Sequence, residues 1–336
     1  MAESSHDQSR SAPVVTSTAS WTPERLTDRV QAEQLIARLF PELRGQPVRP
    51  LAEGWDNSVF SVGEDLVFRF PRRAMALPGV RREIAVLPVI APLVPLPIPT
   101  PAYVGVGVGV GVGVDDHPED PWPFFGARLV PGKELALSAL SDAARVPAAE
   151  AAGAFLRALH APETLTAVQA GTDGPLPHDP MHRAWPRSRI ADTRTLLDTL
   201  ANDGAWAADV QADRLLAEAV ELDAPESAGA LVHGDLHIRH LLADATGSQA
   251  RATGVIDWGD VCIGDPAVDL SLGFAAFEGE ARQAFLDAYG GINPEQELRA
   301  RALAIRLSAT LATYALTTRQ DELAAEALRG LRRAIV

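Results

Sequence analysis

The sequence has a single cysteine and no long uninterrupted hydrophobic run, and both absences restrict the class of protein. Cys262 has no second cysteine with which to pair, so an extracellular fold stapled by intramolecular disulfides is excluded. The N-terminal segment lacks the apolar core of a signal peptide, and proline and glycine interrupt the longer weakly polar runs, so no membrane span is predicted. Together these features predict a cytoplasmic protein.

Positive charge is also scarce. The chain has 30 basic and 44 acidic residues, which gives a formal net charge of −14. Nucleic acids and anionic membranes bind positive surfaces, so we expect neither as a partner. An acidic surface can attract a cationic small molecule, although its contribution to solubility is sufficient to explain the composition.

Apolar residues, by contrast, are abundant enough for a large core. The 336 residues are 47% hydrophobic, and the mean hydropathy is close to zero. A globular chain of this length predicts two domains or lobes rather than one.

The N-terminal part of the chain has the pattern of a small β-rich unit. Residues 1–20 are rich in Ser, Thr and Ala and are predicted to be a disordered tail. Thr22 and Pro23 have the pattern of a helix start, and the apolar spacing that follows continues to about residue 40. Turn residues separate the next apolar runs, which predict strands at 48–53, 58–62, 66–70 and 123–131 and one helix at 79–91 that contains Pro88.

Residues 104–114 form a strictly alternating Val-Gly tract. Its spacing does not match the phosphate-binding pattern G-x-G-x-x-G, and no helix is predicted after it. We therefore interpret the tract as an extended strand or hairpin arm without chemistry of its own.

After residue 137 the sequence becomes rich in Ala and Leu at helical spacing. Only the segment 229–270 interrupts the predicted helices, which are 140–160, 183–202, 207–222, 278–290 and 295–330. The chain therefore predicts an α+β fold with a small β-rich N-lobe at 21–131 and a larger helical C-lobe at 132–336.

The interrupting segment carries the chemistry. It contains two loops, "HGDLHIRH" and "IDWGD", each of which follows a short apolar run. A hairpin of residues 241–242 with 255–256 would bring Asp235, His240 and Asp257 to one end. Two carboxylates and a nearby polar group at a cleft between lobes can hold a magnesium nucleotide.

These two loops resemble the aminoglycoside phosphotransferase superfamily, the small-molecule relatives of protein kinases. That superfamily has the pattern H-G-D-x-x-x-x-N, then I-D, then D-P-x-x-D, and this chain has "HGDLHIRH", "VID" and "DPAVD". The N-terminal stretches "EGWDNSVFSV", "LVFRFPRR" and "REIAVLPVI" are similar to its nucleotide-covering turn, its strand with the basic residue and its helix with the acidic partner. The resemblance covers about 45–290 and implies a protein-kinase-like fold.

The resemblance implies a role for each matching residue. Asp235 would accept the proton of a substrate hydroxyl, and Asp257 would bind Mg²⁺. Arg69 replaces the usual lysine, Glu83 would be its partner, and Asp269 would hydrogen-bond the catalytic-loop backbone. The implied nucleotide-binding residues are Arg69, Glu83, Trp55, Asn57 and Ser58, together with Arg128, Leu129 and Val130 near the base.

His240 occupies the position of the superfamily's asparagine. Imidazole is a poor ligand for Mg²⁺, which prefers oxygen. The loop nevertheless resembles that of the macrolide 2′-phosphotransferases, H-G-D-L-H-x-x-H, which implies that His240 lies on the metal side. His233 and His237 would then be structural, because their spacing does not match a zinc site.

This resemblance implies a kinase that transfers the γ-phosphate of GTP, or of ATP, to the 2′-hydroxyl of the desosamine sugar of macrolide antibiotics, with Mg²⁺ as cofactor. A monomer is expected. Phe274, Phe277 and Tyr289 are candidates for an apolar wall of the substrate pocket, with ordinary helix packing as the alternative. Two other functions stay open, namely a kinase for aminoglycosides or other small molecules and a nucleotide-binding pseudokinase.

Overall fold

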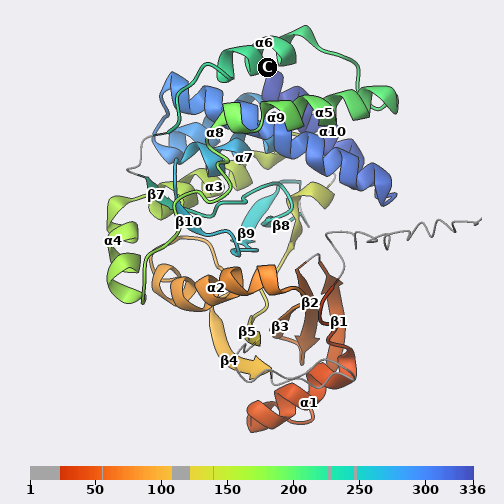
Figure 1. Cartoon of the computed structure of the whole chain (residues 1–336), viewed down its shortest axis with the longest axis vertical. Coiled ribbons are helices and arrows are strands. Elements are labelled where there is room, and N and C mark those ends of the chain that lie inside the picture. Colours follow the sequence, from red (N-terminus) through yellow and green to blue (C-terminus); the bar gives the residue numbers. More distant parts are fainter. Residues whose placement is uncertain (1–22, 55, 108–121, 139, 226–228, 246–247) are drawn as a thin grey trace, which may run out of the picture.

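The computed structural model describes residues 23–336 except 55, 108–121, 139, 226–228 and 246–247. Figure 1 shows a β-rich N-lobe joined to a larger helical C-lobe, which confirms the predicted α+β fold. The predicted tail at 1–20, Trp55 and the Val-Gly tract beyond Gly107 lie outside the described residues. In the part of the chain that is described, no helix is long and apolar enough to span a membrane.

The N-lobe contains a five-stranded antiparallel sheet with the strand order β1-β2-β3-β5-β4. Its inner face is aromatic, because Phe68 and Phe124 are fully buried and the ring centroids of Phe70 and Phe124 lie 4.5 Å apart. The predicted strands are confirmed as β1 (Val48–Glu53), β2 (Asn57–Val62), β3 (Leu66–Pro71) and β5 (Trp122–Arg128), while β4 (Pro101–Gly107) includes the start of the Val-Gly tract.

The first helix, α1 (Arg29–Leu39), begins later than the sequence predicted. Pro23 to Asp28 contain no helix, and Asp28 is the N-cap instead. Its carboxylate accepts a hydrogen bond from the Gln31 backbone N–H, and the Gln31 side chain accepts one from the Asp28 N–H. This reciprocal capping box satisfies two backbone N–H groups at the start of the helix. The helix therefore begins after Asp28 and not at Thr22 and Pro23, where the sequence pattern predicted its start.

Helix α2 (Leu77–Ile90) lies between the N-lobe sheet and the C-lobe (Figure 1). It includes Pro88, and its buried face carries Glu83. Arg82 donates a hydrogen bond of 2.6 Å to the Gly259 carbonyl in the C-lobe. Gly79 lies so close to that same carbonyl that a Cβ there would be 2.7 Å away, so glycine permits the close approach of helix and loop.

The C-lobe is built mainly of helices, and several predictions need correction. The helix predicted at 183–202 begins only at Ile190. The helix predicted at 295–330 is two helices, because the chain reverses at Arg319, whose φ is +58°. The helix predicted from residue 140 begins at Val146, and two helices, α4 and α7, were missed. The helices are α3 (Val146–Leu159), α4 (Pro162–Gly171), α5 (Ile190–Asn202), α6 (Val210–Ala219), α7 (Ala267–Ala276), α8 (Gly279–Tyr289), α9 (Pro294–Thr317) and α10 (Asp321–Ile335).

Short strands hold the two loops that the sequence singled out. Strand β8 (Leu241–Asp244) pairs antiparallel with β9 (Arg251–Val255), and Leu241 lies opposite Val255, so the predicted hairpin is confirmed. Strand β7 (Ala230–Val232) pairs with β10 (Cys262–Gly264), and β6 (Lys133–Glu134) pairs with β8. The remaining elements are the 3₁₀ turns η1 (Pro41–Leu43), η2 (Ala74–Ala76), η3 (Leu135–Leu137), η4 (Ala143–Arg145) and η5 (Pro186–Ser188).

Candidate active site

The loop at residues 233–240, for which the resemblance implies the role of catalytic loop, follows β7 and is fixed through its backbone. The buried Asp269 carboxylate, on α7, accepts hydrogen bonds from the N–H groups of His233 at 2.7 Å and Gly234 at 3.0 Å. This is the contact that the resemblance implied for Asp269. Gly234 has a φ of +89° and lies against the Asp260 carbonyl, where a Cβ would clash, so only glycine fits this turn.

His233 is a framework residue. Its Nδ1 accepts a hydrogen bond from the Asp235 N–H at 3.2 Å, so its Nε2 carries the proton and donates to the Ile256 carbonyl at 3.0 Å. Burial lowers the pKa of His233 to about 4, which keeps the ring neutral and compatible with both bonds. The side chain thereby ties the catalytic loop to the chain segment that leads into Asp257.

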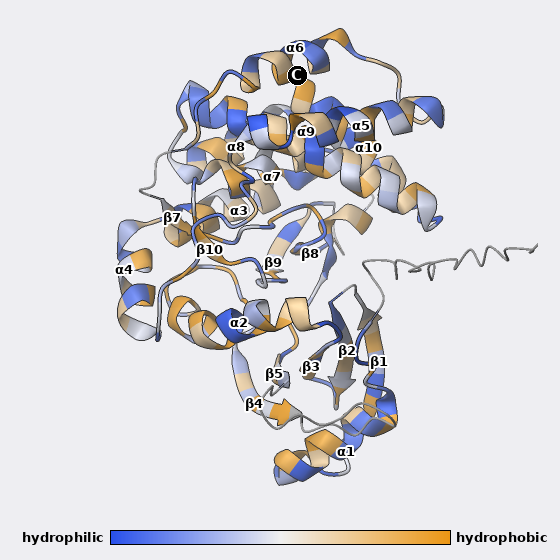
Figure 2. Cartoon of the chain, viewed as in Figure 1, coloured by the Kyte–Doolittle hydropathy of each residue, from blue (hydrophilic) through white to orange (hydrophobic). Residues whose placement is uncertain are grey.

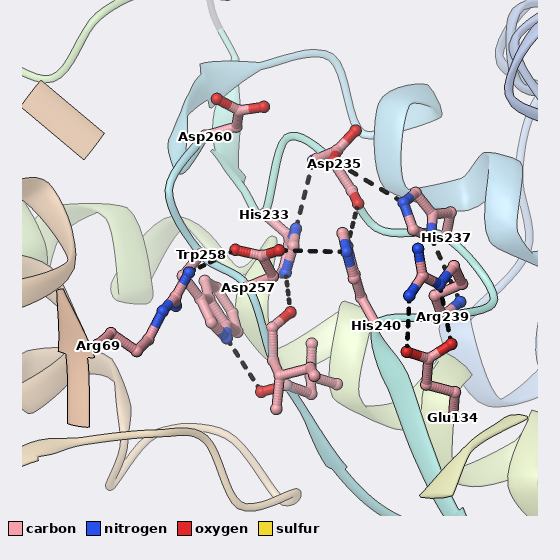
Figure 3. A network of polar contacts seen from close by, with 12 residues as sticks. Arg69, Glu134, His233, Asp235, His237, Arg239, His240, Asp257, Trp258 and Asp260 are labelled. Atoms are coloured by element: carbon pink, nitrogen blue, oxygen red, sulfur yellow. Dashed lines mark hydrogen bonds and ion pairs between the residues drawn. The ribbon is translucent and has the colours of Figure 1, made fainter. Parts of the chain in front are cut away.

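His240 is oriented differently, with one nitrogen facing a carboxylate (Figure 3). Its Nδ1 lies 2.8 Å from the Asp235 carbonyl oxygen, to which only an N–H can donate. In the neutral ring the lone pair is then on Nε2, which lies 3.4 Å from Asp257 Oδ2. A histidine whose other nitrogen donates to a backbone carbonyl is the common arrangement of a metal ligand.

His237 lies close to the same centre but is a weaker candidate ligand. Among the described residues, Asp235, His237 and His240 are a group whose potential ligand atoms all lie within 4.8 Å of one another. However, His237 Nδ1 accepts a hydrogen bond from the Arg239 N–H at 3.3 Å. In the neutral ring the proton is then on Nε2, the atom that faces Asp235 Oδ2 at 3.9 Å, so no lone pair is directed toward a metal there.

Asp257 is held between the two lobes. Arg69 Nη2 donates to Asp257 Oδ1 at 2.7 Å, while Arg69 Nη1 donates to Glu83 Oε1 at 2.6 Å. Glu83 also accepts a hydrogen bond from the Trp258 N–H at 3.2 Å. The strand β3, helix α2 and the "IDWGD" loop therefore meet in one ion-pair network, which contains the Arg69–Glu83 pair that the resemblance implied.

The charges in this network determine which groups are ionised. Partial burial disfavours the charged form of Asp257, but the Arg69 guanidinium beside it outweighs this effect and holds the pKa of Asp257 well below its usual range. Burial raises the pKa of the Glu83 carboxyl above its usual range, against the effect of Arg69. Asp257 is thus a carboxylate at neutral pH, as a ligand for a divalent cation must be.

Asp235 keeps part of its side chain accessible. The carboxylate is 28% exposed, and Oδ1 lies 3.3 Å from Arg183 Nη2. Burial raises the pKa of Asp235 to about 6, while the charge of Arg183 acts in the opposite direction. A half-buried carboxylate of this basicity can accept a proton from a hydroxyl group near neutral pH.

The predicted nucleotide-binding residues have mixed surroundings. Asn57 and Ser58 are buried at the start of β2, and Asn57 Oδ1 has no hydrogen-bond donor within the described part of the chain. Arg128 and Leu129 are exposed at the end of β5, whereas Val130 is buried. The Leu129 N–H donates to the Asp65 carbonyl at 2.7 Å, so in this conformation it is not available to a nucleotide base.

The predicted apolar wall is wrong for two of its three residues. Phe274 and Phe277 are fully buried in the C-lobe core, which excludes direct contact with a substrate. Helix α7 is buried on nearly all sides, so its aromatic residues fill the interior. The Tyr289 hydroxyl lies 3.1 Å from His160 Nδ1, and His160 Nε2 lies 3.0 Å from Asp269, which connects Tyr289 to the support of the catalytic loop.

Two site contacts could not be recognised from the motifs. Arg183, from the segment between α4 and α5, donates to the Gly234 carbonyl at 2.5 Å and to Asp260 Oδ2 at 2.7 Å. Arg239 donates two hydrogen bonds to Glu134, at 2.8 and 3.0 Å, and fixes the loop beside His240 (Figure 3). In the sequence, "PHDPMHR" and "HIRH" each contain only one arginine, and no motif marks either as a site residue.

Comparisons with known proteins agree with this site. The curated relatives include viomycin phosphotransferase from Streptomyces vinaceus, 33% identical over 140 residues, which are 41% of this chain and 47% of that protein. The uncharacterized protein YcbJ from Bacillus subtilis (strain 168) is 32% identical over 105 residues, 30% of this chain and 33% of that protein. The matches thus span about half or less of the curated relatives' length.

Solved structures share the fold. The GDP complex of wild-type aminoglycoside 2′-phosphotransferase-IIIa has a TM-score of 0.60 at 22% identity and covers 92% of this chain and 99% of that one. Macrolide 2′-phosphotransferase MphH from Brachybacterium faecium, as the apoenzyme, has a TM-score of 0.52 at 22% identity, with 88% and 98% covered. The model of the family described as "Phosphotransferase enzyme family" matches residues 47–304, so this chain belongs to that family.

Proposed function

We propose that this protein is a Mg²⁺-dependent kinase that transfers the γ-phosphate of GTP, or of ATP, to the 2′-hydroxyl of the desosamine sugar of macrolide antibiotics. The observation that carries the proposal is His240. It stands where the wider superfamily has asparagine, and its Nε2 faces Asp257 while its Nδ1–H donates to the Asp235 carbonyl. The loop with this histidine is the feature that resembles the macrolide 2′-phosphotransferases.

In the proposed reaction, the chain's own residues position and deprotonate the acceptor. Asp235 would accept a hydrogen bond from the acceptor hydroxyl and take its proton as the oxygen bonds to the γ-phosphorus, while the bond from the γ-phosphorus to the β–γ bridging oxygen breaks and GDP or ADP leaves. Asp257 and His240 would hold the magnesium ion, whose chemistry when bound is to neutralise charge on the nucleotide phosphates. Arg69, which now pairs with Asp257 and Glu83, offers a guanidinium for the phosphate oxygens.

The donor set fits a divalent cation. A carboxylate that remains ionised at neutral pH is a hard oxygen ligand, and the imidazole beside it is a borderline one. The intact pair of Asp235 and Asp257 also supports an active enzyme over a pseudokinase, because both the base and the metal carboxylate are present at the loop.

The charges next to Asp235 favour a macrolide over an aminoglycoside. An aminoglycoside carries many amines and requires a densely acidic cleft. Here the neighbours of Asp235 include Arg183, and Arg189 and Arg306 line the adjoining depression. A substrate with one dimethylammonium group suits this mixed environment better, and Asp260, which pairs with Arg183 through Oδ2 and whose side chain is 42% exposed, is a carboxylate near its expected position.

A matrix of acceptors and nucleotides tests this function. Purified protein with Mg²⁺ is incubated with erythromycin, kanamycin or viomycin, each with GTP or ATP, and products are identified by mass spectrometry. We expect phosphorylated erythromycin, with GTP as the better donor. Phosphorylation of kanamycin or viomycin alone would contradict the macrolide assignment, and nucleotide binding without any transfer would favour the pseudokinase.

A further inference from the structure

A second polar site adjoins the catalytic loop. Arg183 links the two, because it contacts the loop and also lines this site. The segment that carries Arg183 is fastened to β10, since the Asp179 N–H donates to the Ile263 carbonyl at 2.8 Å. The Asp179 carboxylate in turn accepts the N–H groups of Arg183 and Ala184, each at 3.0 Å. Arg183 is therefore held in a fixed position beside Asp235.

Beyond Arg183 the surface forms an open depression with an empty volume of about 260 Å³. It lies among η5, α5, α6 and α9, at the end of the C-lobe away from the N-lobe, where hydrophobic and hydrophilic residues are interspersed (Figure 2). Four arginines line it, together with the Thr193 side chain and an apolar floor that includes Leu303. The arginines are Arg183, Arg189, Arg299 and Arg306.

Two of these arginines already have their charge balanced. Arg183 contacts Asp235 and Asp260. Arg299 donates to Glu295 at 2.5 Å and to the Ala184 and Asp223 carbonyls, and it lies 4.0 Å from Asp265. These two guanidiniums therefore serve structural contacts first.

The other two have donors to spare. In the described part of the chain, the Arg189 guanidinium donates only to the Met181 carbonyl. Arg306 Nη1 is buried and has no hydrogen-bond acceptor there, and its nearest carboxylate, Asp192, lies 3.8 Å away with its side chain 64% exposed. Burial, and then the charges of Arg189 and Arg183, lower the pKa of Arg306 against the effect of Asp192. An unsatisfied buried donor among like charges is a costly arrangement that an anion would relieve.

We infer that the depression lined by Arg183, Arg189 and Arg306 is a binding site for a tetrahedral oxyanion, a phosphate or sulfate group. Guanidinium groups bind such oxyanions through several charge-assisted hydrogen bonds. Because Arg183 belongs both to this site and to the surroundings of Asp235, an occupant would lie on the acceptor side of the catalytic loop. The occupant is a free oxyanion or an anionic group on an acceptor molecule; a macrolide, which carries a cation and no anionic group, leaves the site to the free oxyanion. This inference does not depend on which antibiotic is phosphorylated.

Inorganic phosphate is the probe. Its affinity for the complete protein is measured by isothermal titration calorimetry, with potassium chloride of equal ionic strength as the reference. We expect Arg306→Gln and Arg189→Gln each to weaken phosphate binding about tenfold or more, as expected for loss of a charged hydrogen bond. Arg29→Gln, an exposed N-lobe arginine paired with Glu33, is the matched control and should bind as the wild type does.

Melting temperatures measured without phosphate show whether each variant folds. If Arg306→Gln does not fold, Arg189→Gln, at the rim of the depression, still tests the site. Inhibition kinetics identify the source of the oxyanion. Phosphate that competes with the acceptor indicates that the site holds a group of the acceptor, and non-competitive inhibition indicates a free oxyanion. Either pattern supports the site. Unchanged phosphate affinity in folded Arg306→Gln and Arg189→Gln would overturn it.

Discussion

At the scale of single residues, the geometry separates the tasks of the three histidines and the aspartate of one loop. His233 and His237 accept backbone N–H groups at Nδ1, and His240 is placed to donate to a backbone carbonyl from the same atom. This difference in tautomer, which the sequence does not show, leaves His240 as the histidine whose lone pair faces Asp257. Asp235 is the remaining carboxylate and keeps an exposed edge.

Replacement of Asp235 by asparagine tests its proposed role as the base. The amide keeps the size and the backbone contacts but cannot take a proton, so we expect kcat to fall by about 10² to 10⁴. The melting temperature should change little, because the side chain is 28% exposed and lies at the cleft. Asp198→Asn, an exposed residue on α5, is the control for the loss of one charge. Turnover close to that of the wild type would remove Asp235 from the mechanism.

Two replacements of His240 distinguish a metal role from other roles. If the imidazole supports Mg²⁺, His240→Asn should keep substantial activity, since an amide oxygen is a better magnesium ligand, and His240→Ala should lose far more. Turnover is measured over a range of magnesium concentrations. A metal role predicts that excess Mg²⁺ partly restores the alanine variant. If both variants match the wild type at every concentration, His240 is not part of the site.

At the scale of elements, glycine and buried charge determine where strands and helices can meet. Gly105 in β4 lies against the Phe124 ring, where a Cβ would be 2.5 Å from Cζ, so the glycines of the Val-Gly tract are required for packing at least at this end. In the C-lobe, Glu326 on α10 accepts hydrogen bonds from Arg145 at 2.6 Å and Arg333 at 2.8 Å, all inside the protein.

Shortening of the Val-Gly tract should have little effect. Deletion of residues 105–112 removes four Gly-Val pairs and leaves a glycine directly after Val104, so the residue opposite Phe124 is still glycine. We expect nucleotide affinity and turnover to stay within about twofold of the wild type. A change in the tract should not alter a separate site with which it shares no contacts, because the effects of independent sites are additive. Gly105→Val is the contrasting variant and should lower the melting temperature. Strong loss of nucleotide binding on deletion would show that the tract has a function.

The buried Glu326 predicts a defined pH dependence of stability. Glu326→Gln leaves Arg145 without its charged partner and should lower the free energy of unfolding at pH 7 by about 3 to 5 kcal/mol. Burial disfavours the carboxylate, but Arg145 and Arg333 outweigh it and lower the pKa of Glu326 to about 2. The stabilisation is therefore complete above the ordinary value of 4.5 and is lost as the pH falls toward 2.

Urea unfolding measures this effect. The difference between wild type and Glu326→Gln should be constant near neutral pH and should shrink below about pH 4.5. Glu322→Gln, exposed on the first turn of the same helix, should show no such difference. A gap between wild type and variant that does not change with pH would rule out the ion pair as its cause.

At the scale of the whole molecule, the sequence predicted the two-lobed architecture and the loops that meet in the cleft. The motifs succeed because short spacings such as Asp235 to His240 are set by one loop and its hairpin. Helix ends and pocket walls depend on tertiary contacts, so the start of α1, the break at Arg319 and the burial of Phe274 were not predictable. Arg183 reaches Asp235 from 52 positions earlier in the chain, a contact that no local pattern shows.

The proposed activity, with Asp235 as the base, is phosphorylation of a macrolide at one hydroxyl. The most direct measurement incubates wild type and Asp235→Asn with erythromycin, Mg²⁺ and GTP, and locates any phosphate on the product by phosphorus and proton NMR. We predict a phosphomonoester on the 2′-oxygen of desosamine with the wild type and none with the variant. An unmodified erythromycin with the wild type, or the same product from both proteins, would contradict the account.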